Sequence, residues 1–372
     1  MNKKKKILFF HFDLGGGGAE KVLVNLVNNL NPDKYDITLY TVFNYGVYKN
    51  SFEEHIKRKT IFNKQFKGFI TMAKLLSPGL LHKLFIREKY DIEIGFYHRF
   101  PARVIGGCKD KDTKKFAWVH SKMISPEDFF TSYRSIDEAN RIYHSFNKVA
   151  FVAQTAKDEF LKQTGWNDID CQVVHNVMDI DDIILKSKQE IDLKLDHKKL
   201  NLCSVGRLTD LKGYDRLFKC FCDLVKENYI DWNFYLLGKG EEESHLKQLV
   251  KEFGLDSYVT FIGFNSNPYK YVSKMDMFVC SSLVEGYSTA VAESVIVGVP
   301  VLTTDCSGMY EILGDEAGMI VENSEKGLFD GLKFILSDKD VINNLRLGVK
   351  SRQKIFSTDY SIKEFENFIE TK

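Results

Sequence analysis

Two glutamates near the start of one helix could bind a nucleotide. Glu285 follows a short apolar segment at 275–280 with the pattern of a buried strand, and Glu293 lies in the helical pattern after it. Ser288 or Thr289 can cap that helix, whose first-turn N–H groups suit a phosphate. Glu293 lies about one turn inside the helix, so its carboxylate could accept hydrogen bonds from the hydroxyls of a ribose next to that phosphate. Glu285 could then bind a second sugar. The alternative is that both carboxylates only complement the helix dipole.

Two cations lie in a loop that could clamp a diphosphate. Arg207 and Lys212 follow an expected strand at 200–205. Arginine binds phosphate oxygens in a planar contact, and lysine acts as a point charge. Gly206 and Gly213 flank the two cations and favour the close approach of a ligand. The alternative for each cation is a solvated position on the surface.

A run of glycines near the N-terminus offers a second phosphate loop. Residues 15–18 are all glycine, and they separate an apolar segment at 7–12 from a helical pattern at 19–30. A strand, a glycine loop and a helix open a nucleotide-binding α/β unit. A dinucleotide fingerprint would also need a glycine near Lys21 and an acid after the strand at 36–42, and both are absent. An equally good interpretation of the glycines is a tight turn that only allows the strand and the helix to pack.

Strand and helix patterns alternate along the whole chain, which predicts doubly wound parallel sheets. A polar segment at 186–199 separates two such series and marks the expected linker. His120 follows the strand at 115–119, at the sheet edge where ligands bind in open α/β folds. The expected strands are 7–12, 36–42, 91–96, 115–119, 149–153, 171–174, 200–205, 232–237, 258–262, 275–280, 299–303 and 319–321.

Composition excludes several classes of protein. The chain has 372 residues, enough for two domains, and a net charge of +1 gives no general attraction to nucleic acid. Seven scattered cysteines without a C-x-x-C pair indicate reduced thiols and a cytoplasmic protein. No apolar stretch is long enough to span a membrane. We interpret the Asp-x-Asp strings at 168–170 and 179–181 as helix caps and not as metal ligands, and we expect no cofactor.

One segment carries a concentrated positive charge. Residues 49–89 contain ten Lys or Arg and three Glu, a net charge of 10 − 3 = +7, with apolar residues between them. A basic amphipathic stretch of this kind can lie on an anionic membrane surface, at the inner face of the cell membrane. The alternative is a core-packing helix whose charged face is solvated.

The residues in both halves resemble the retaining glycosyltransferases of family 4. The resemblance rests on Gly206-Arg207, Lys212-Gly213, Glu285-Gly286 and Glu293, with seven residues between the two glutamates, and the glycine loop at 15–18 and His120 fit the same family. It implies an α/β fold of the GT-B class, with two Rossmann-like doubly wound parallel-sheet domains facing a central cleft. We expect an acceptor-side domain at 1–185, a nucleotide-sugar-binding domain at 186–355, and a last segment at 356–372 crossing back to the first domain.

The resemblance also implies a role for each site residue. The catalytic group would comprise Arg207 and Lys212 on the donor diphosphate, Glu285 on hydroxyls of the donor sugar, and His120 beside that sugar. Glu293 would bind the ribose. The remaining donor contacts would come from Gly16, Gly17, Gly206, Phe264, Gly286, Tyr287, Ser288 and Thr289. Members of the family work without a bound metal, because the cations and the helix N-terminus take that role.

The resemblance implies a reaction class and leaves its specificity open. The expected reaction moves a sugar from a nucleotide diphosphate, in the first place UDP, to a glycan or lipid-linked acceptor in polysaccharide or glycoconjugate synthesis. Many relatives have Phe-Gly or Phe-Pro after the first Glu-Gly, whereas this chain has Tyr287-Ser288, so the donor sugar stays undetermined. The alternatives are an enzyme like the nucleotide-sugar 2-epimerases and a non-catalytic scaffold subunit that binds a sugar nucleotide.

Overall fold

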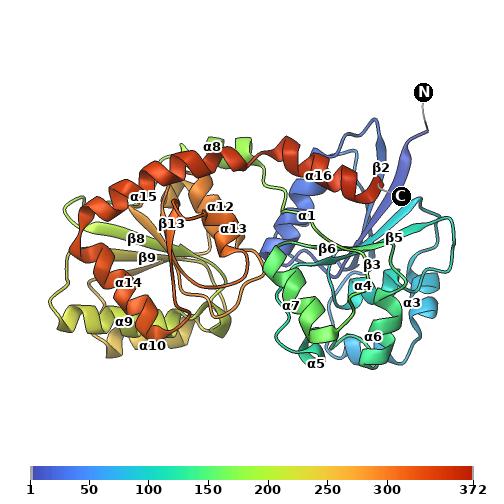
Figure 1. Ribbon diagram of the computed structural model, residues 1–372, viewed down its shortest axis with the longest axis horizontal. Coiled ribbons are helices and arrows are strands. Elements are labelled where there is room, and N and C mark those ends of the chain that lie inside the picture. Colours follow the sequence, from blue (N-terminus) through green and yellow to red (C-terminus); the bar gives the residue numbers. More distant parts are fainter. Residues whose placement is uncertain (1–2, 371–372) are drawn as a thin grey trace. The chain divides into compact units, whose positions relative to one another are not determined.

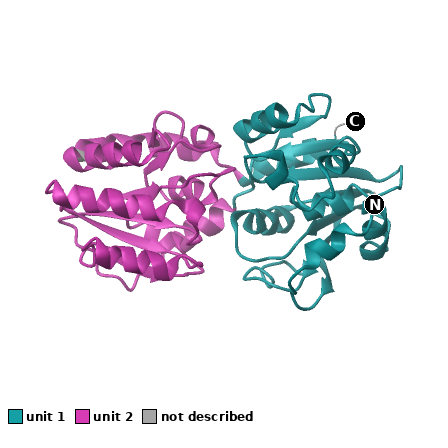
Figure 2. Ribbon diagram, turned by 90° about the horizontal axis from the view of Figure 1, so that it is seen from below, with its two compact units in different colours: residues 1–178, 358–372 teal, residues 179–357 magenta. Residues whose placement is uncertain are grey.

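The chain forms two compact units. A computed structural model describes residues 3–370. Unit 1 comprises Met1–Met178 and Thr358–Lys372, and unit 2 comprises Asp179–Ser357 (Figure 2). Unit 2 begins before the polar segment at 186–199, because helix α8 (Ile180–Ser187) packs on α11 and α12 of that unit. The last two residues of the segment at 356–372 lie outside the described residues.

Unit 1 is built on a parallel sheet, here called sheet A, with helices on both faces (Figure 1). Its order is β3-β2-β1-β4-β5-β6-β7. The strands are β1 (Lys5–His11), β2 (Tyr35–Phe43), β3 (Lys57–Phe62), β4 (Ile92–Gly95), β5 (Lys114–Val119), β6 (Lys148–Phe151) and β7 (Cys171–Val173). The helices are α1 (Gly18–Asn29), α2 (Phe69–Lys74), α3 (Pro78–Phe85), α4 (Phe100–Ile105), α5 (Pro126–Phe129), α6 (Ile136–Tyr143), α7 (Gln154–Thr164) and α16 (Thr358–Glu370).

Unit 2 repeats the scheme on sheet B, whose order is β10-β9-β8-β11-β12-β13. The strands are β8 (Leu200–Val205), β9 (Trp232–Leu237), β10 (Val259–Gly263), β11 (Met277–Cys280), β12 (Val301–Thr304) and β13 (Gly318–Val321). Besides α8, the helices are η1 (Asp210–Lys212), α9 (Tyr214–Lys226), α10 (Glu243–Glu252), α11 (Tyr269–Val272), α12 (Thr289–Ile296), α13 (Met309–Leu313), α14 (Glu325–Ser337), α15 (Lys339–Arg352) and η2 (Gln353–Ile355).

Both sheets reverse their strand order at one point, which fixes where ligand loops can gather. The reversal lies between β1 and β4 in sheet A and between β8 and β11 in sheet B, and all strand pairs there are parallel. At such a switch point the loops after the two neighbouring strands leave the same edge in opposite directions and open a crevice. In unit 2 these loops are residues 206–213 and 281–288, which carry the predicted cations and glutamates.

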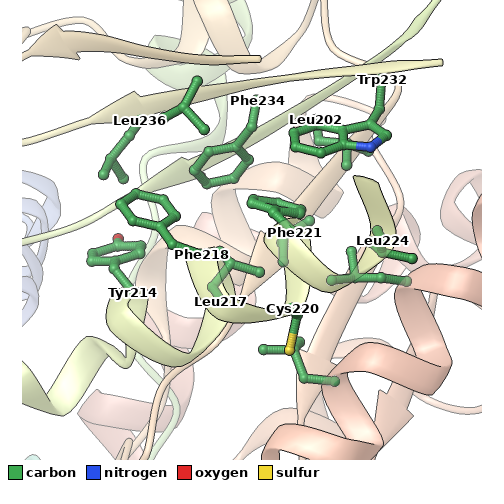
Figure 3. Close-up of a cluster of buried hydrophobic side chains, with 14 of the residues drawn as sticks. Leu202, Tyr214, Leu217, Phe218, Cys220, Phe221, Leu224, Trp232, Phe234 and Leu236 are labelled. Carbon is green, nitrogen blue, oxygen red and sulfur yellow. The ribbon is translucent and has the colours of Figure 1, made fainter. Parts of the chain in front are cut away.

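The core of unit 2 fixes the start of helix α9, next to the cation loop. Residues 214, 217, 218, 221 and 224 of α9 are buried at helical spacing and face β8 and β9 (Figure 3). Phe221 stacks on Trp232 with ring centroids 4.4 Å apart. Burial of this kind contributes roughly 1.5–3 kcal/mol for each large side chain. The cation loop therefore ends at a helix whose first turn is packed in the core.

The expected doubly wound parallel sheets are confirmed, but one strand was missed. Every strand expected from the sequence has a counterpart, whereas residues 57–62 form the edge strand β3 instead of an amphipathic stretch. Lys57 forms an ion pair with Asp36 on β2 at 2.6 Å, and Lys59 pairs with Glu88. Charged residues are typical of edge strands, because they discourage pairing with another chain. The charge at the start of the basic segment is thus partly neutralised within unit 1.

The phenylalanines of the basic segment also have a packing role. The rings of Phe62, Phe66 and Phe69 contact one another and Phe43, with centroids 5.2–5.9 Å apart. Edge-to-face pairs at this distance stabilise a core beyond their area burial. The alternative to membrane contact, core packing of this segment, therefore holds for these aromatic residues, although other apolar side chains there remain exposed.

Several simpler expectations can be compared with the structure. Within residues 3–370, no helix combines the length and the hydrophobicity needed to cross a membrane. All seven cysteines are free, and six of them are buried. Asp179 caps α8 by accepting a hydrogen bond from Asp182 N at 3.1 Å, as expected. Asp168 is not a cap: it pairs with His144 at 3.1 Å, so that expectation was wrong.

The last helix completes unit 1. Phe365 of α16 is fully buried and stacks on Phe9 of β1 and Trp118 of β5, with centroids 6.0 and 5.8 Å apart. Glu364 accepts hydrogen bonds from the backbone N–H of His175 at 2.8 Å. Helix α16 lies beside α1 (Figure 1). The C-terminal segment therefore covers one face of sheet A.

We predict that Phe365→Ala lowers the free energy of unfolding of unit 1 by about 3–5 kcal/mol, because it leaves a cavity against two aromatic rings. Urea unfolding followed by tryptophan fluorescence, to which Trp118 contributes, measures the loss. Tyr360→Ala on the same helix is the matched control, since Tyr360 is 62% exposed. Equal effects of the two substitutions would contradict the packing assigned to α16.

Candidate functional site

The two switch-point loops of unit 2 are joined by hydrogen bonds. Ser281 Oγ donates to Lys212 O at 2.8 Å, and Leu283 N donates to Leu211 O at 2.8 Å. Gly213 permits this approach: its φ is +60°, and a Cβ there would lie 2.4 Å from Ser281 O. The glycine is therefore required by the turn and by loop packing, whether or not a ligand is present.

Lys212 and Glu285 meet at the centre of these loops. Lys212 Nζ lies 2.5 Å from Glu285 Oε1, and Ser282 Oγ donates to the same oxygen at 2.7 Å. The two charged side chains are only 25% and 12% exposed. Burial alone would lower the pKa of Lys212, but the charge of Glu285 outweighs it and holds this pKa above its ordinary value. Lys212 is therefore a fixed cation at neutral pH.

Arg207 lies in the same loop but is not part of this ion pair. Its side chain is exposed, beyond the carboxyl end of β8. Packing alone explains the glycine at position 206, because a Cβ there would lie 2.9 Å from Tyr214 Oη. The carbonyl oxygen of Gly206 also packs against Gly238. The loop thus presents one exposed cation and one cation held in an ion pair at the same sheet edge.

Helix α12 places the second glutamate. Ser288 is its N-cap residue, and within the described chain the Ser288 side chain makes no capping hydrogen bond. First-turn N–H groups of α12 are thus left for another acceptor. Glu293 is 7% exposed and accepts a hydrogen bond from Tyr269 Oη at 3.2 Å. Thr289 begins the helix, so the predicted order of cap, first turn and carboxylate is present.

Gly286 and Tyr287 connect Glu285 to this cap. They pack against Gly308, whose φ is +78°. A Cβ at position 308 would lie 3.0 Å from Gly286 O and 3.2 Å from Tyr287 Cα, so the two segments are in close contact. A small cavity with mixed polar and apolar walls lies at these loops. It is lined by Ser204, Val205, Lys212, Tyr214, Phe278, Cys280, Ser281, Ser282, Ser288 and Ala290.

Two positioning residues were missed by the sequence analysis. Arg216 on α9 donates to Ser281 O at 2.7 Å and to Ser282 O at 2.9 Å, and it also donates to Asn323 Oδ1 at 2.8 Å. Asn323 in turn donates to Leu283 O at 2.9 Å. Together they hold the backbone that carries Glu285. Little in the sequence indicated this role, because a single arginine in a helical pattern is usually a solvated charge on the surface.

Phe264 lies in the loop after β10, at the same edge of sheet B. Its ring is 51% exposed, and Lys239 Nζ lies 5.1 Å from the ring centroid. A partly exposed aromatic ring next to a cation can stack on a base. Gly263, with φ +82°, makes the turn that presents this ring.

The glycine loop of unit 1 is a tight packed turn. Gly16 has φ +116°, and a Cβ there would lie 2.9 Å from Val47 Cγ2. Gly17 is the N-cap residue of α1 and has no side chain to cap the helix. Leu14 N donates to Tyr45 O at 2.9 Å, which ties this loop to the turn after β2. These contacts support the alternative that the glycines serve the packing of strand and helix.

His120 lies at the carboxyl edge of sheet A, as predicted. Its ring is 4.7 Å from that of Phe96, and its Nε2 is buried without a hydrogen-bond partner among residues 3–370. Burial, with a smaller effect of His11, lowers the pKa of His120 to about 3. His11 itself lies 3.6 Å from Glu20 on α1. His120 is thus a neutral imidazole at neutral pH.

The predicted residues therefore fall into two groups. Unit 2 brings together Arg207, Lys212, Glu285, Glu293 and the loop residues between them on the switch point of sheet B. Unit 1 holds Gly16, Gly17 and His120 at the switch-point edge of sheet A. Each group occupies the position at which open α/β sheets bind ligands.

Comparison with known proteins identifies the class of unit 2. Residues 186–354 match the family described as "Glycosyl transferases group 1", so this part of the chain is a glycosyl transferase domain. The matched region contains all the site residues of unit 2.

Relatives over the whole length have related names. The chain is 27% identical over 366 residues to the "N-acetylgalactosamine-N,N'-diacetylbacillosaminyl-diphospho-undecaprenol 4-alpha-N-acetylgalactosaminyltransferase" of Campylobacter jejuni, covering 95% of this chain and 96% of that protein. It is 24% identical to the "Lipopolysaccharide core biosynthesis glycosyltransferase LpsE" of Rhizobium meliloti, covering 93% and 92%. Homologues of the complete chain are thus glycosyltransferases.

Solved structures confirm the fold class. Anabaena HepE in complex with UDP-glucose is similar with a TM-score of 0.75 and 19% identity, covering 98% of this chain and 99% of that one. WaaG, a glycosyltransferase of lipopolysaccharide biosynthesis, is similar with a TM-score of 0.73 and 13% identity, covering 98% and 100%. The neighbours are glycosyltransferases of the GT-B class, and the chain has their two-domain α/β fold.

We predict that His120 stays neutral down to about pH 4, because its pKa in the folded protein is about 3. In the unfolded chain a histidine has a pKa of about 6.5. The unfolded state therefore binds more protons between these values, and the stabilisation from neutral His120 is complete above about pH 6.5 and is lost as pH falls toward 3. Histidine ring NMR signals across pH 4–8, assigned with His120→Gln, test this. A midpoint near 6.5 for His120 would contradict its burial.

Proposed function

We propose that the protein is a retaining, metal-independent glycosyltransferase that uses a UDP-sugar and a glycan or lipid-linked acceptor. The observation that carries the proposal is the ion pair between Lys212 and Glu285 at the switch point of sheet B, in the two loops that also carry Arg207 and lead into the N-terminus of α12. These groups supply two positive charges and backbone N–H donors for a diphosphate, next to carboxylates for sugar hydroxyls.

The names of relatives support the donor and acceptor classes. The Campylobacter relative is named for the transfer of N-acetylgalactosamine to a diphospho-undecaprenol acceptor, and LpsE for lipopolysaccharide core synthesis. HepE was solved with UDP and with UDP-glucose. A UDP-linked hexose or N-acetylhexosamine is the donor class that fits them, in synthesis of a cell-surface polysaccharide or glycoconjugate at the cytoplasmic face of the membrane.

The proposed role of the cations follows from the charge that develops in the reaction. The bond between the sugar C1 and the diphosphate oxygen breaks, and the electron pair stays on that oxygen. Arg207, Lys212 and the α12 N–H groups stabilise this charge without a metal ion. The acceptor hydroxyl oxygen forms the new bond to C1 on the face that the diphosphate leaves, and its proton passes to the departing diphosphate oxygen, so the configuration at C1 is retained.

A panel of nucleotide sugars tests the proposal directly. Release of UDP from one donor, dependent on an added glycan or lipid-linked acceptor, is the expected result. The anomeric coupling constant of the product should match that of the donor. A panel in which no nucleoside diphosphate is released with any acceptor, while UDP still binds, would favour a non-catalytic subunit.

We predict that Arg207→Ala and Lys212→Ala each lower kcat by ~100-fold or more, because each removes a charge that stabilises the leaving diphosphate. Lys326→Ala on α14 is the matched control, since it removes an exposed cation elsewhere in unit 2. Steady-state UDP release measures the effect. Turnover like that of the parent in both site variants would end this account.

Addition of a chelator during turnover completes that experiment. We expect an unchanged rate, because the protein cations replace the metal. A strict requirement for an added divalent cation would show that another group neutralises the diphosphate.

We predict that the two glutamates have separable effects. Glu293→Ala should weaken binding of free UDP, because its proposed partner is the ribose. Glu285→Ala should leave UDP binding intact or tighter, because Lys212 loses its competing partner at 2.5 Å, while sugar transfer falls. Calorimetry with UDP and the turnover assay measure both properties. UDP binding by Glu293→Ala as tight as that of the parent would refute its placement.

We also propose that residues 49–89 contact an anionic membrane, through α2 and α3. Leu75 is 80% exposed and Met72 is 61% exposed, while Lys64 and Lys67 are exposed nearby. Arg103 and Arg134 donate hydrogen bonds to the carbonyl oxygens of residues 73–76, which holds this exposed turn in place. Each basic residue at such a surface contributes about 1 kcal/mol.

We predict that the protein sediments with anionic vesicles at low salt and that Leu75→Glu reduces the bound fraction. The substitution removes apolar contact and adds repulsion from the lipid headgroups. Leu347→Glu in unit 2 is the matched control, since Leu347 is 65% exposed outside the proposed surface. Equal sedimentation with neutral vesicles, or the same loss in both variants, would remove the membrane proposal and leave the transferase proposal unaffected.

A further inference from the structure

Three potential metal ligands meet in unit 1, away from the loops described above. His82 of α3, Glu93 of β4 and Cys108 in the turn after α4 each offer a ligand atom, and these atoms lie within 4.8 Å of one another. His82 Nε2 and Glu93 Oε2 are 2.7 Å apart. The His82 side chain is 15% exposed, Glu93 is 2% exposed and Cys108 is 7% exposed.

The cluster lies at the amino edge of sheet A. Glu93 is the second residue of β4, and Cys108 precedes the start of β5. His120 follows the end of β5, at the opposite edge. Parallel strands β4 and β5 run side by side in register, so the two edges are separated by the length of the strands. The cluster therefore does not belong to the switch-point crevice of unit 1.

The backbone holds the three side chains together. A Cβ at Gly107 would lie 2.1 Å from Pro78 O, so the turn that carries Cys108 packs directly on the first residue of α3. A Cβ at Gly106 would lie 2.3 Å from the Ile142 side chain on α6. Ligand sites held by packed, rigid elements keep their geometry better than sites on exposed loops.

We propose that His82, Glu93 and Cys108 bind a divalent transition-metal cation of the zinc type, which ties α3, β4 and the turn after α4 together. An imidazole nitrogen, a carboxylate oxygen and a thiolate sulfur are the ligands that zinc takes, with a fourth position for water. Around tetrahedral zinc, such atoms lie roughly 3.3–3.8 Å apart. The cation replaces the direct hydrogen bond between His82 and Glu93 after a small outward shift of the two side chains.

The charges of the cluster also fit a divalent cation. Glu93 and a Cys108 thiolate supply two negative charges in a buried position, where a single unpaired charge would be costly. Lys115 places a positive charge beside the cluster, because its Nζ lies 3.5 Å from the carbonyl oxygen of Cys108. This charge opposes the binding of a cation. Removal of this positive charge should therefore tighten metal binding, an effect that a cluster without a metal function would not show.

Titration of the full-length, reduced, chelator-treated protein with Co²⁺ tests the proposal. One equivalent should bind and give the near-ultraviolet band of a cobalt–thiolate bond, and Zn²⁺ should remove the band. Cys108→Ser should abolish it, whereas Cys171→Ser, a half-buried thiol on β7, should leave it unchanged. His82→Gln should weaken Co²⁺ binding by at least about 10-fold, and Lys115→Met should strengthen it.

Thermal unfolding gives a second readout that does not depend on cobalt. Zn²⁺ should raise the Tm of the parent, but not that of Cys108→Ser. Neither Co²⁺ nor Zn²⁺ should change UDP binding. Failure of the metal-site proposal is therefore distinguishable from failure of the proposed transferase function. The absence of a thiolate band in the parent, or its persistence in Cys108→Ser, would overturn the proposal and leave His82–Glu93 as a buried ion pair.

Discussion

The ion pair between Lys212 and Glu285 depends on one topological constraint. β8 and β11 are neighbours at the point where sheet B reverses its order, so the loops after them must leave the same edge. Residues 73 positions apart in the chain are thereby brought to 2.5 Å. Hydrogen bonds from Arg216 and Ser281 then fix the two loops to each other. The fold therefore brings a cation and a carboxylate to one edge of the sheet.

The same ion pair connects the structure to the proposed chemistry. Glu285 neutralises the charge of Lys212 in a largely buried position. A diphosphate would offer Lys212 a stronger partner, and Glu285 would then be released toward the hydroxyls of the sugar. Lys212 keeps its charge in both situations, because its pKa is held above the ordinary value. In the proposed function, one side-chain exchange would thus couple nucleotide binding to sugar binding.

The sequence alone was sufficient for the elements with strong local patterns. Apolar strands followed by glycine or small residues predicted the parallel sheets, and Ser288 with its downstream apolar pattern predicted α12. Strand β3 was missed because an edge strand with Lys57 and Lys59 lacks the apolar signal of a buried one. Its charges are neutralised by Asp36 and Glu88, which no local pattern reveals.

Long-range contacts account for the parts of the site that could not be predicted. Arg216 and Asn323 act on residues 281–283 only after the sheet has formed, so their spacing carries no signal. The low pKa of His120 comes from burial against Phe96 and from His11, both distant in the chain. The catalytic and binding roles suggested by the family resemblance are thus compatible with local geometry, while the residues that hold this geometry emerge only from the fold.

An experimental structure of the full-length protein with UDP is the most direct test of the central claim. The account predicts the diphosphate within hydrogen-bond distance of Arg207 Nη, Lys212 Nζ and the first-turn N–H groups of α12, with the ribose hydroxyls on Glu293. It also predicts that Lys212 has left Glu285, from which it is 2.5 Å away without ligand. A nucleotide bound elsewhere, or bound here with the ion pair between Lys212 and Glu285 intact and no phosphate contact, would contradict it.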